Sequence, residues 1–420
     1  MSGSNAGRGV FTESANQSAR PGNTWGPGPQ TPVVQKAAKA FTELHGHAPA
    51  GVWSAPGRVN LIGEHTDYNN GFVAPFALPH RAAVAASPRT DGVLTVATLG
   101  DDGQLQAADP VVIASVAPGD VSGWAAYPAG VAWSLREHGI DLSGADLVVS
   151  GNVPTGAGLS SSHALECATA LALLGLAGRE VDQPGTPTRP EIARLVQRTE
   201  NDFVGAMTGL LDQTASLCCV AGHVLFLDVR SGESEQVPFD AEAAGLEVLV
   251  IDTRAKHALV DSGYGERRRG CEQAASLLGL PSLREITDLD AALDALPTEL
   301  KPLVRHVVTE NARVLSVVGK LKSGRLDQIG PELTASHLSL RDDYQVSCLE
   351  LDVAVDAALS AGALGARMIG GGFGGSAIAL VHASSRPAVE QAVLDAYAAH
   401  SLTPPRLFVG VPSPGAGRDE

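Results

Sequence analysis

A glycine-rich loop at residues 154–162, with the sequence Pro-Thr-Gly-Ala-Gly-Leu-Ser-Ser-Ser, carries the first potential chemistry. Glycine lets the backbone approach a ligand closely, and a helix that follows presents unpaired N–H groups and the positive end of its dipole. That combination binds phosphate. The loop lacks the Gly-Lys-Ser/Thr ending of a P-loop and the Gly-x-Ser-x-Gly of a nucleophile elbow. The alternative is a serine-capped helix after a tight turn.

A polar segment at residues 57–71 lies between stretches that are typical of β-strands. It gathers Glu64, His65, Thr66 and Asp67 with a tyrosine and two asparagines, which could accept and donate hydrogen bonds to the hydroxyls of a sugar. A solvated turn is one alternative, because Asn-Asn-Gly favours turns. A metal site is another, although no second cluster of His or Cys stands at ligand spacing.

A second glycine loop at residues 370–375 contains five glycines in six positions. Gly370, Gly372 and Gly375 formally match a dinucleotide-binding G-x-G-x-x-G, but a β-like run follows where that fingerprint needs a helix. We therefore expect a loop whose backbone approaches something closely, or else a plain glycine-rich hairpin.

Strands and helices are segregated along the chain, which predicts an α+β fold with two lobes. We expect a disordered arm over residues 1–30, an amino-terminal lobe over 31–225 and a carboxy-terminal lobe over 226–420. Periodicity predicts the following helices: 33–44, 124–138, 160–176, 191–204, 211–220, 266–278, 300–321, 348–360 and 388–399. It predicts strands at 52–54, 72–78, 82–87, 93–99, 146–149, 223–229, 247–252, 366–369, 377–381 and 407–409.

Composition restricts the partners of this 420-residue chain. Hydrophobic residues make up 44% and charged residues 18%, as in a globular protein, and the net charge of −16 argues against nucleic acid or an anionic membrane as partner. The five cysteines form no metal-binding spacing and their odd number indicates a reducing compartment. The apolar run at residues 167–178 is too short to span a bilayer. We expect a cytoplasmic protein.

The order of the three motifs is more specific than each motif alone. Together they resemble the GHMP kinase superfamily from about residue 33 to the end of the chain, and residues 57–68 resemble the signature of the galactokinase family within it. The resemblance implies two α+β lobes, the first like domain 2 of ribosomal protein S5 and the second ferredoxin-like, with the site in the cleft between them. It implies ATP-dependent phosphorylation of galactose at its anomeric hydroxyl, with Mg²⁺ as cofactor.

The resemblance also implies a role for individual residues. Asp212 matches the catalytic base and Arg58 the arginine that stabilises the transition state. Positions that match the sugar-binding residues are Glu64, His65, Asp67 and Tyr264. Those that match the ATP-phosphate loop are Gly156, Ala157, Gly158, Leu159, Ser160, Ser161 and Ser162. Those that match the magnesium ligands are Ser162 and Glu200.

One departure from the superfamily pattern is His163, which follows the serines where alanine is common. It could be a neighbour of the phosphates, but we expect a partly exposed helix residue. A second departure is apolar: residues 208–211 read Thr-Gly-Leu-Leu where Cys-Gly-Ile-Met is common, and we expect Asp212 to keep its position.

Three functional hypotheses remain open at this point. The first is a galactose kinase that binds galactose and ATP and acts as a monomer. The second is a related sugar kinase, for example for N-acetylgalactosamine. The third is a sugar- and ATP-binding regulator without catalysis, which the intact Arg58, Asp212 and serine run argue against.

Overall fold

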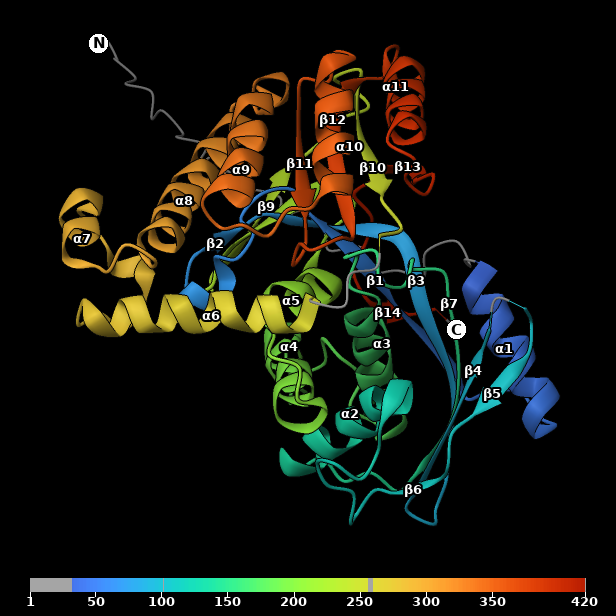
Figure 1. The fold of residues 1–420 in the computed structure, drawn as a ribbon. Coiled ribbons are helices and arrows are strands. Elements are labelled where there is room, and N and C mark those ends of the chain that lie inside the picture. The colour runs from blue at the N-terminus through green and yellow to red at the C-terminus, as the bar shows by residue number, and fades with distance from the viewer. Residues whose placement is uncertain (1–31, 101, 256–259, 420) are drawn as a thin grey trace, which may run out of the picture.

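The computed structural model describes residues 32–100, 102–255 and 260–419, so the expected arm over 1–30 lies outside the described residues. Two large sheets organise the molecule, one at the top of Figure 1 and the other at its right. The helices are α1 (Pro32–His45), α2 (Ala126–Glu137), α3 (Ser161–Leu176), α4 (Arg189–Arg198), α5 (Leu211–Cys218), α6 (Val260–Leu277), α7 (Leu289–Ala295), α8 (Lys301–Lys322), α9 (Gly330–Asp342), α10 (Leu349–Ser360) and α11 (Arg386–Ala399).

The first sheet has seven strands in the described chain and the order β14-β1-β3-β7-β4-β5, with β6 paired to β4. Its strands are β1 (Gly51–Asn60), β3 (Pro75–Pro88), β4 (Val93–Leu99), β5 (Leu105–Ala107), β6 (Val111–Val112), β7 (Ala145–Gly151) and β14 (Gly417–Arg418). Only β4 and β7 pair in parallel among these strands. The sheet is therefore mostly antiparallel, as an α+β fold requires.

Alternation along β3 explains how both faces of this sheet are covered. Ala83 and Ala85 pack with α1, whereas Val84 and Ala86 pack with the core that includes α2, α3 and α4. Successive strand residues point to opposite faces, so a run of small and branched apolar residues can serve two layers. The glycine-rich loop at residues 154–162, which precedes α3, is thereby fixed to a sheet that is buried on both faces.

The strand β3 corrects one prediction. Residues 72–78 and 82–87 were expected as two strands with a turn between them, but the structure has one continuous strand from Pro75 to Pro88. Pro79 is exposed, and it lies where the β1–β3 register shifts between Pro56 and Arg58. Proline lacks an N–H group and is tolerated at such an irregularity, which the turn-like residue types concealed.

The second sheet has the strand order β11-β12-β10-β13 and is antiparallel throughout. Its strands are β10 (Leu246–Asp252), β11 (Gly365–Ile369), β12 (Ser376–His382) and β13 (Arg406–Gly410). In chain order this is the 4-1-3-2 arrangement of a ferredoxin-like fold, with α10 and α11 as its two crossover helices. The expected second lobe is confirmed, and α7 and α9 are additional helices that the periodicity did not predict.

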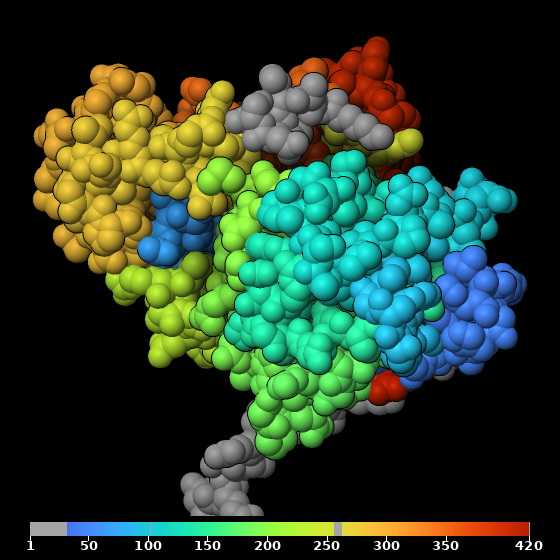
Figure 2. Space-filling view, turned by 90° about the horizontal axis from the view of Figure 1, so that it is seen from below, coloured from blue at the N-terminus to red at the C-terminus, as the bar shows by residue number. Residues whose placement is uncertain are grey.

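Two features tie the halves of the chain together. A three-stranded sheet joins β2 (Phe72–Val73) to β8 (His223–Asp228) and β9 (Ser234–Pro238), and the carboxy-terminal β14 pairs with β1. In Figure 2, α1 and the α7–α8 region lie at opposite ends of the visible face. The lobe boundary at residues 225 and 226 stays a prediction. Within the described ranges, no helix is long and apolar enough to cross a membrane.

Candidate active site

A cavity of about 750 Å³ opens where the polar segment, the first glycine loop and the second glycine loop meet. Its wall also includes the start of α5 and residues of α6. The three motifs that stand up to 300 residues apart in the sequence therefore share one site. Of the fourteen predicted site residues, twelve line this cavity, and Ala157 and Glu200 do not.

The first glycine loop turns sharply before α3. Gly156 and Gly158 have φ angles of 75° and 69°, and Ser160 adopts the left-handed region at φ 62°. Gly156, Gly158 and residues 159–162 line the cavity. Ala157 does not: it is 2% exposed, and its carbonyl accepts a hydrogen bond of 2.7 Å from the Ser376 hydroxyl. The loop thus presents its glycines and serines to the cavity and anchors Ala157 to β12.

The glycines of the second loop permit this anchoring. A β-carbon on Gly370 would lie 3.1 Å from the Gly158 carbonyl oxygen, and one on Gly375 would lie 3.3 Å from that of Ala157. Both glycines also have positive φ angles, 78° and 81°. The close approach expected from the sequence is an approach of the two glycine loops to each other. It places the ends of β11 and β12 next to the first glycine loop.

Arg58 and Asp212 form a bidentate ion pair at the centre of the cavity wall. Arg58 Nε donates to Asp212 Oδ1 at 2.7 Å, and its Nη2 donates to Oδ2 at 2.8 Å. The third nitrogen, Nη1, donates to the Gly158 carbonyl at 2.6 Å, and Ser160 donates its hydroxyl to Asp212 Oδ2. The fork geometry fixes both side chains relative to the glycine loop.

The electrostatics of this pair keep Asp212 ionised. Burial alone would raise the pKa of Asp212, but Arg58, His163 and the Ser160 hydroxyl together lower it below its ordinary value. Asp212 is the second residue of α5, so its carboxylate also lies at the positive end of that helix. An ionised carboxylate that faces a cavity can accept a proton from a bound hydroxyl group.

Asp67 lies beside Asp212 and shares the cavity. Burial and the nearby charge of Asp212 raise the pKa of Asp67 from 3.8 to about 6. Its carboxylate lies directly against Gly209, where any β-carbon would overlap the Asp67 oxygens. Gly209 is therefore a residue of the cavity wall that the sequence did not single out, since its φ angle is ordinary and only its neighbour excludes a side chain.

Glu64 is held rigidly at the junction of the two halves. Its carboxylate forms an ion pair with Arg367 Nη2 at 2.6 Å, and it accepts hydrogen bonds from Asn60 Nδ2 at 2.7 Å and the Gly370 N–H at 2.9 Å. Arg367 is fully buried on β11 and also donates to the Asn60 and Leu61 carbonyls. Arg367 was not among the predicted site residues, although an arginine within an apolar strand signals a buried charged partner.

His65 and Tyr264 form an aromatic wall of the cavity. The His65 ring centroid lies 5.4 Å from that of Tyr264, and His65 Nδ1 lies 2.8 Å from the Tyr68 hydroxyl. The Tyr68 hydroxyl contacts that of Tyr344 at 2.8 Å. Burial and His306 lower the pKa of His65 to about 3, so this ring is neutral. Such a wall offers a flat apolar face with hydrogen-bonding edges to a sugar.

His163 is a correction to the sequence analysis. It was expected to be a partly exposed helix residue, but it is 5% exposed and its ring contacts three polar side chains. Its Nε2 lies 3.1 Å from Glu200 Oε2, and its Nδ1 lies 3.4 Å from Asp212 Oδ2 and 3.3 Å from the Ser162 hydroxyl. Burial alone would lower the pKa of His163, but Glu200 and Asp212 raise it above its ordinary value.

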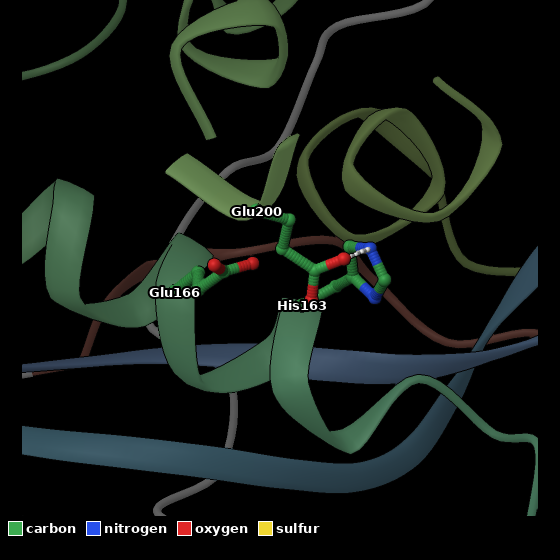
Figure 3. Close-up of side chains that lie close together, drawn as sticks. All are labelled: His163, Glu166 and Glu200. Carbon is green, nitrogen blue, oxygen red and sulfur yellow. Dashed lines mark ion pairs between the residues drawn. The ribbon is translucent and has the colours of Figure 1, made fainter. Parts of the chain in front are cut away.

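Glu200 lies behind this ring. It is 2% exposed and belongs to a single π-helical segment, Thr199–Val204, where one helix over 191–204 was expected. Irregular turns of this kind occur often at functional sites. Glu166, one turn after His163 on α3, points its carboxylate toward Glu200 (Figure 3). Glu166 was not among the predicted site residues, because a glutamate in the middle of a helix is usually exposed.

Three family descriptions match the chain in order: "Galactokinase galactose-binding signature" at residues 39–88, "GHMP kinases N terminal domain" at 126–219 and "GHMP kinases C terminal" at 317–399. The chain is 54% identical over 397 residues to the galactokinase of Streptomyces coelicolor, which covers 92% of this chain and 98% of that protein. It belongs to the galactokinase family of the GHMP kinases.

Other relatives agree with this assignment. The galactokinase of Mycobacterium tuberculosis is 42% identical over 366 residues, 87% of this chain and 98% of the relative. The structure resembles that of Lactococcus lactis galactokinase complexed with galactose, with a TM-score of 0.82, 33% identity, and coverage of 90% and 98% of the two chains. As a galactokinase, the protein is an ATP-using enzyme that phosphorylates galactose. The expected superfamily, fold class and activity are confirmed.

Proposed function

We propose that this galactokinase binds galactose and the ATP phosphates side by side in the 750 Å³ cavity and phosphorylates the anomeric hydroxyl. The observation that carries this proposal is the Arg58–Asp212 pair, which touches the first glycine loop on one side and lies beside Asp67 on the other. A base next to a phosphate-binding loop is the arrangement that phosphoryl transfer to a hydroxyl needs.

In the proposed step the sugar hydroxyl gives its proton to Asp212 as its oxygen bonds to the γ-phosphorus, and ADP leaves. Arg58 keeps Asp212 ionised and lies close to the transferred charge. The glycine loop holds the phosphates with its backbone N–H groups and with the serines at the start of α3. The chain has both an aspartate at position 212 and an arginine at position 58, which favours an enzyme over a non-catalytic regulator.

The sugar side of the cavity is proposed to consist of Glu64, His65, Asp67 and Tyr264, all of which line it. They combine acceptors with a neutral imidazole and a phenol, and Glu64 is fixed by three donors. The Lactococcus lactis relative was solved with galactose, which supports this placement. Fixed polar partners discriminate well, because a substrate that misplaces a hydroxyl leaves them unpaired.

Ser162 and Glu200 are proposed to hold Mg²⁺. A hydroxyl and a carboxylate suit a hard divalent cation that also binds phosphate oxygens, and such a cation would neutralise charge on the triphosphate. Ser162 lies at Nδ1 of the His163 ring and Glu200 at its Nε2, so the two donors would share one ion once this ring turns aside. The monomeric state and a cytoplasmic location are part of the proposal, and all five cysteines are free thiols in agreement with the latter.

The experiment that tests the proposal compares kcat/KM for galactose, glucose and N-acetylgalactosamine, with the product identified by ³¹P NMR. We expect galactose to lead by roughly 100-fold or more, the scale on which unpaired polar groups reject a substrate, and the product to be a 1-phosphate. A preference for N-acetylgalactosamine would show that the sugar-binding residues are assigned wrongly. A phosphate on another hydroxyl would show that the proposed orientation of the sugar is wrong.

A further inference from the structure

Three buried side chains form a compact cluster beside the cavity. His163 and Glu166 are three residues apart on α3 and share one face of that helix, and Glu200 reaches them from the π-helical segment (Figure 3). One ligand atom of each lies within 4.8 Å of the other two. One imidazole and two carboxylates in this arrangement are a donor set that binds divalent metals.

Glu166 gives an independent reason to expect a ligand here. It is fully buried, yet neither of its carboxylate oxygens has a hydrogen-bond partner among the described residues. An unpaired buried carboxylate is costly, and native structures normally provide a partner for one. Figure 3 shows this carboxylate turned toward Glu200 rather than away from the cluster.

We propose that His163, Glu166 and Glu200 form a binding site for a first-row transition-metal dication, one that is occupied without nucleotide. Two carboxylates would balance the double charge of the ion, and the imidazole nitrogen would favour Zn²⁺, Co²⁺ or Mn²⁺ over Mg²⁺. The three ligand atoms lie within 4.8 Å of one another, so rotations of the side chains would bring them to a common ion.

The site lies next to the reacting groups and shares Glu200 with the proposed Mg²⁺ site, from which it differs in its other two ligands, His163 and Glu166. His163 lines the cavity, whereas Glu166 and Glu200 are not among its described lining residues. His163 is thus the member of the cluster at the cavity wall, and an ion would reach the cluster past its ring. Because His163 also contacts Asp212, an ion bound by this ring would fix the ring against the base. This inference goes beyond the proposed function. Because Glu200 belongs to both proposed sites, the two ions would compete for it, and the metal is therefore tested without nucleotide.

The test uses the full chain, stripped with EDTA, dialysed and free of nucleotide. Co²⁺ is titrated while the visible d–d absorption is recorded, Zn²⁺ is then added as competitor, and thermal unfolding is followed with and without each metal. The variants are Glu166→Gln, which keeps the shape and removes the charge, and His163→Ala. Matched controls are His400→Ala and Glu242→Gln, which change exposed residues of the same types.

We expect one Co²⁺ per chain, displacement by Zn²⁺, and a rise in Tm on binding. Both cluster variants should bind at least roughly tenfold more weakly, since loss of even an outer-shell partner costs about 10–100-fold, while both controls should match the parent. The proposal is overturned if the stripped protein binds Co²⁺ only when ATP is present, or if Glu166→Gln binds as the parent does. It is equally overturned if the parent binds no metal. In that case a Glu166→Gln variant more stable than the parent would indicate that Glu166 is a buried carboxyl group without a ligand.

Discussion

At the residue scale, charge placement decides what the cavity can do. Asp212 and Asp67 are two neighbouring carboxyl groups with opposite shifts of pKa: that of Asp212 is lowered and that of Asp67 is raised. Arg58 pairs with Asp212 in bidentate fashion, so the charge of Asp212 is compensated and that of Asp67 is less so. Neighbouring carboxyl groups with separated pKa values commonly take different roles, one as base and one as binding group.

The raised pKa of Asp67 predicts a pH dependence of stability. Its carboxyl group titrates near 6 in the folded protein and near 3.8 when exposed. Between these values the folded state holds the proton and the unfolded state does not, so the contribution of Asp67 to stability falls as pH rises. Relative to Asp67→Asn, the parent should therefore lose Tm between about pH 4 and about pH 6.

The measurement is thermal unfolding of both proteins across that range without ligands. A Tm difference that stays constant with pH would show that the pKa of Asp67 is not raised. Asp240→Asn serves as the control, because this carboxylate is exposed and far from the ion pair.

Some residues of the site could be assigned from the sequence and others could not. The order of three motifs was enough to nominate Arg58, Asp212 and Asp67, which the structure brings to one cavity. His163, Glu166 and Arg367 could not be assigned from one sequence, because their burial depends on what the opposite elements place against them. His163 and Glu166 meet Glu200 from a different helix, and Arg367 meets Glu64, which lies about 300 residues earlier in the turn after β1.

At the element scale, the turn before α5 positions the sugar side of the cavity. Gly209 lies against the Asp67 carboxylate without a left-handed backbone, so only steric exclusion demands glycine there. We predict that Gly209→Ala displaces the Asp67 carboxylate and raises KM for galactose by about tenfold, the effect of roughly 1.4 kcal/mol in binding, with KM for ATP little changed.

Steady-state kinetics in both substrates check this prediction. Gly319→Ala is the matched control, because a β-carbon on that helical glycine meets nothing within 4 Å. That control should keep both KM values. If Gly209→Ala leaves the galactose KM unchanged as well, Asp67 does not contact the sugar.

Regular helices and strands were easier to predict than the irregular segments within and between them. Amphipathic and alternating patterns gave most helices and the ferredoxin-like strands within a few residues, as at α3 and β12. The continuous β3 and the π-helical segment at Thr199–Val204 were missed. Both depart from regular geometry because of a partner, which for β3 is the irregular pairing with β1.

At the scale of the whole molecule, one buried arginine joins the two large sheets. Arg367 on β11 pairs with Glu64 and donates to the carbonyls of Asn60 and Leu61 at the end of β1. Removing one member of a buried ion pair typically costs about 3–5 kcal/mol. We therefore predict that Arg367→Met lowers the free energy of unfolding by about that amount.

Urea unfolding of the full chain measures this effect. Arg406→Met is the control, because Arg406 is largely exposed in its ion pair with Asp252 and should change stability by about 0–1 kcal/mol. The double variant with Glu64→Gln should cost less than the sum of the single variants, since the two side chains share one interaction. Full additivity would contradict a direct link through this pair.

The account depends most on Asp212 as the group that accepts the sugar proton. The most direct test is kcat of Asp212→Asn with saturating galactose and MgATP, beside ligand dissociation constants from calorimetry and an Asp202→Asn control at an exposed position. The account predicts that kcat falls by about 100-fold or more, the scale of a lost general base, while both ligands still bind and the control stays active. A variant that retains most of its kcat would contradict it.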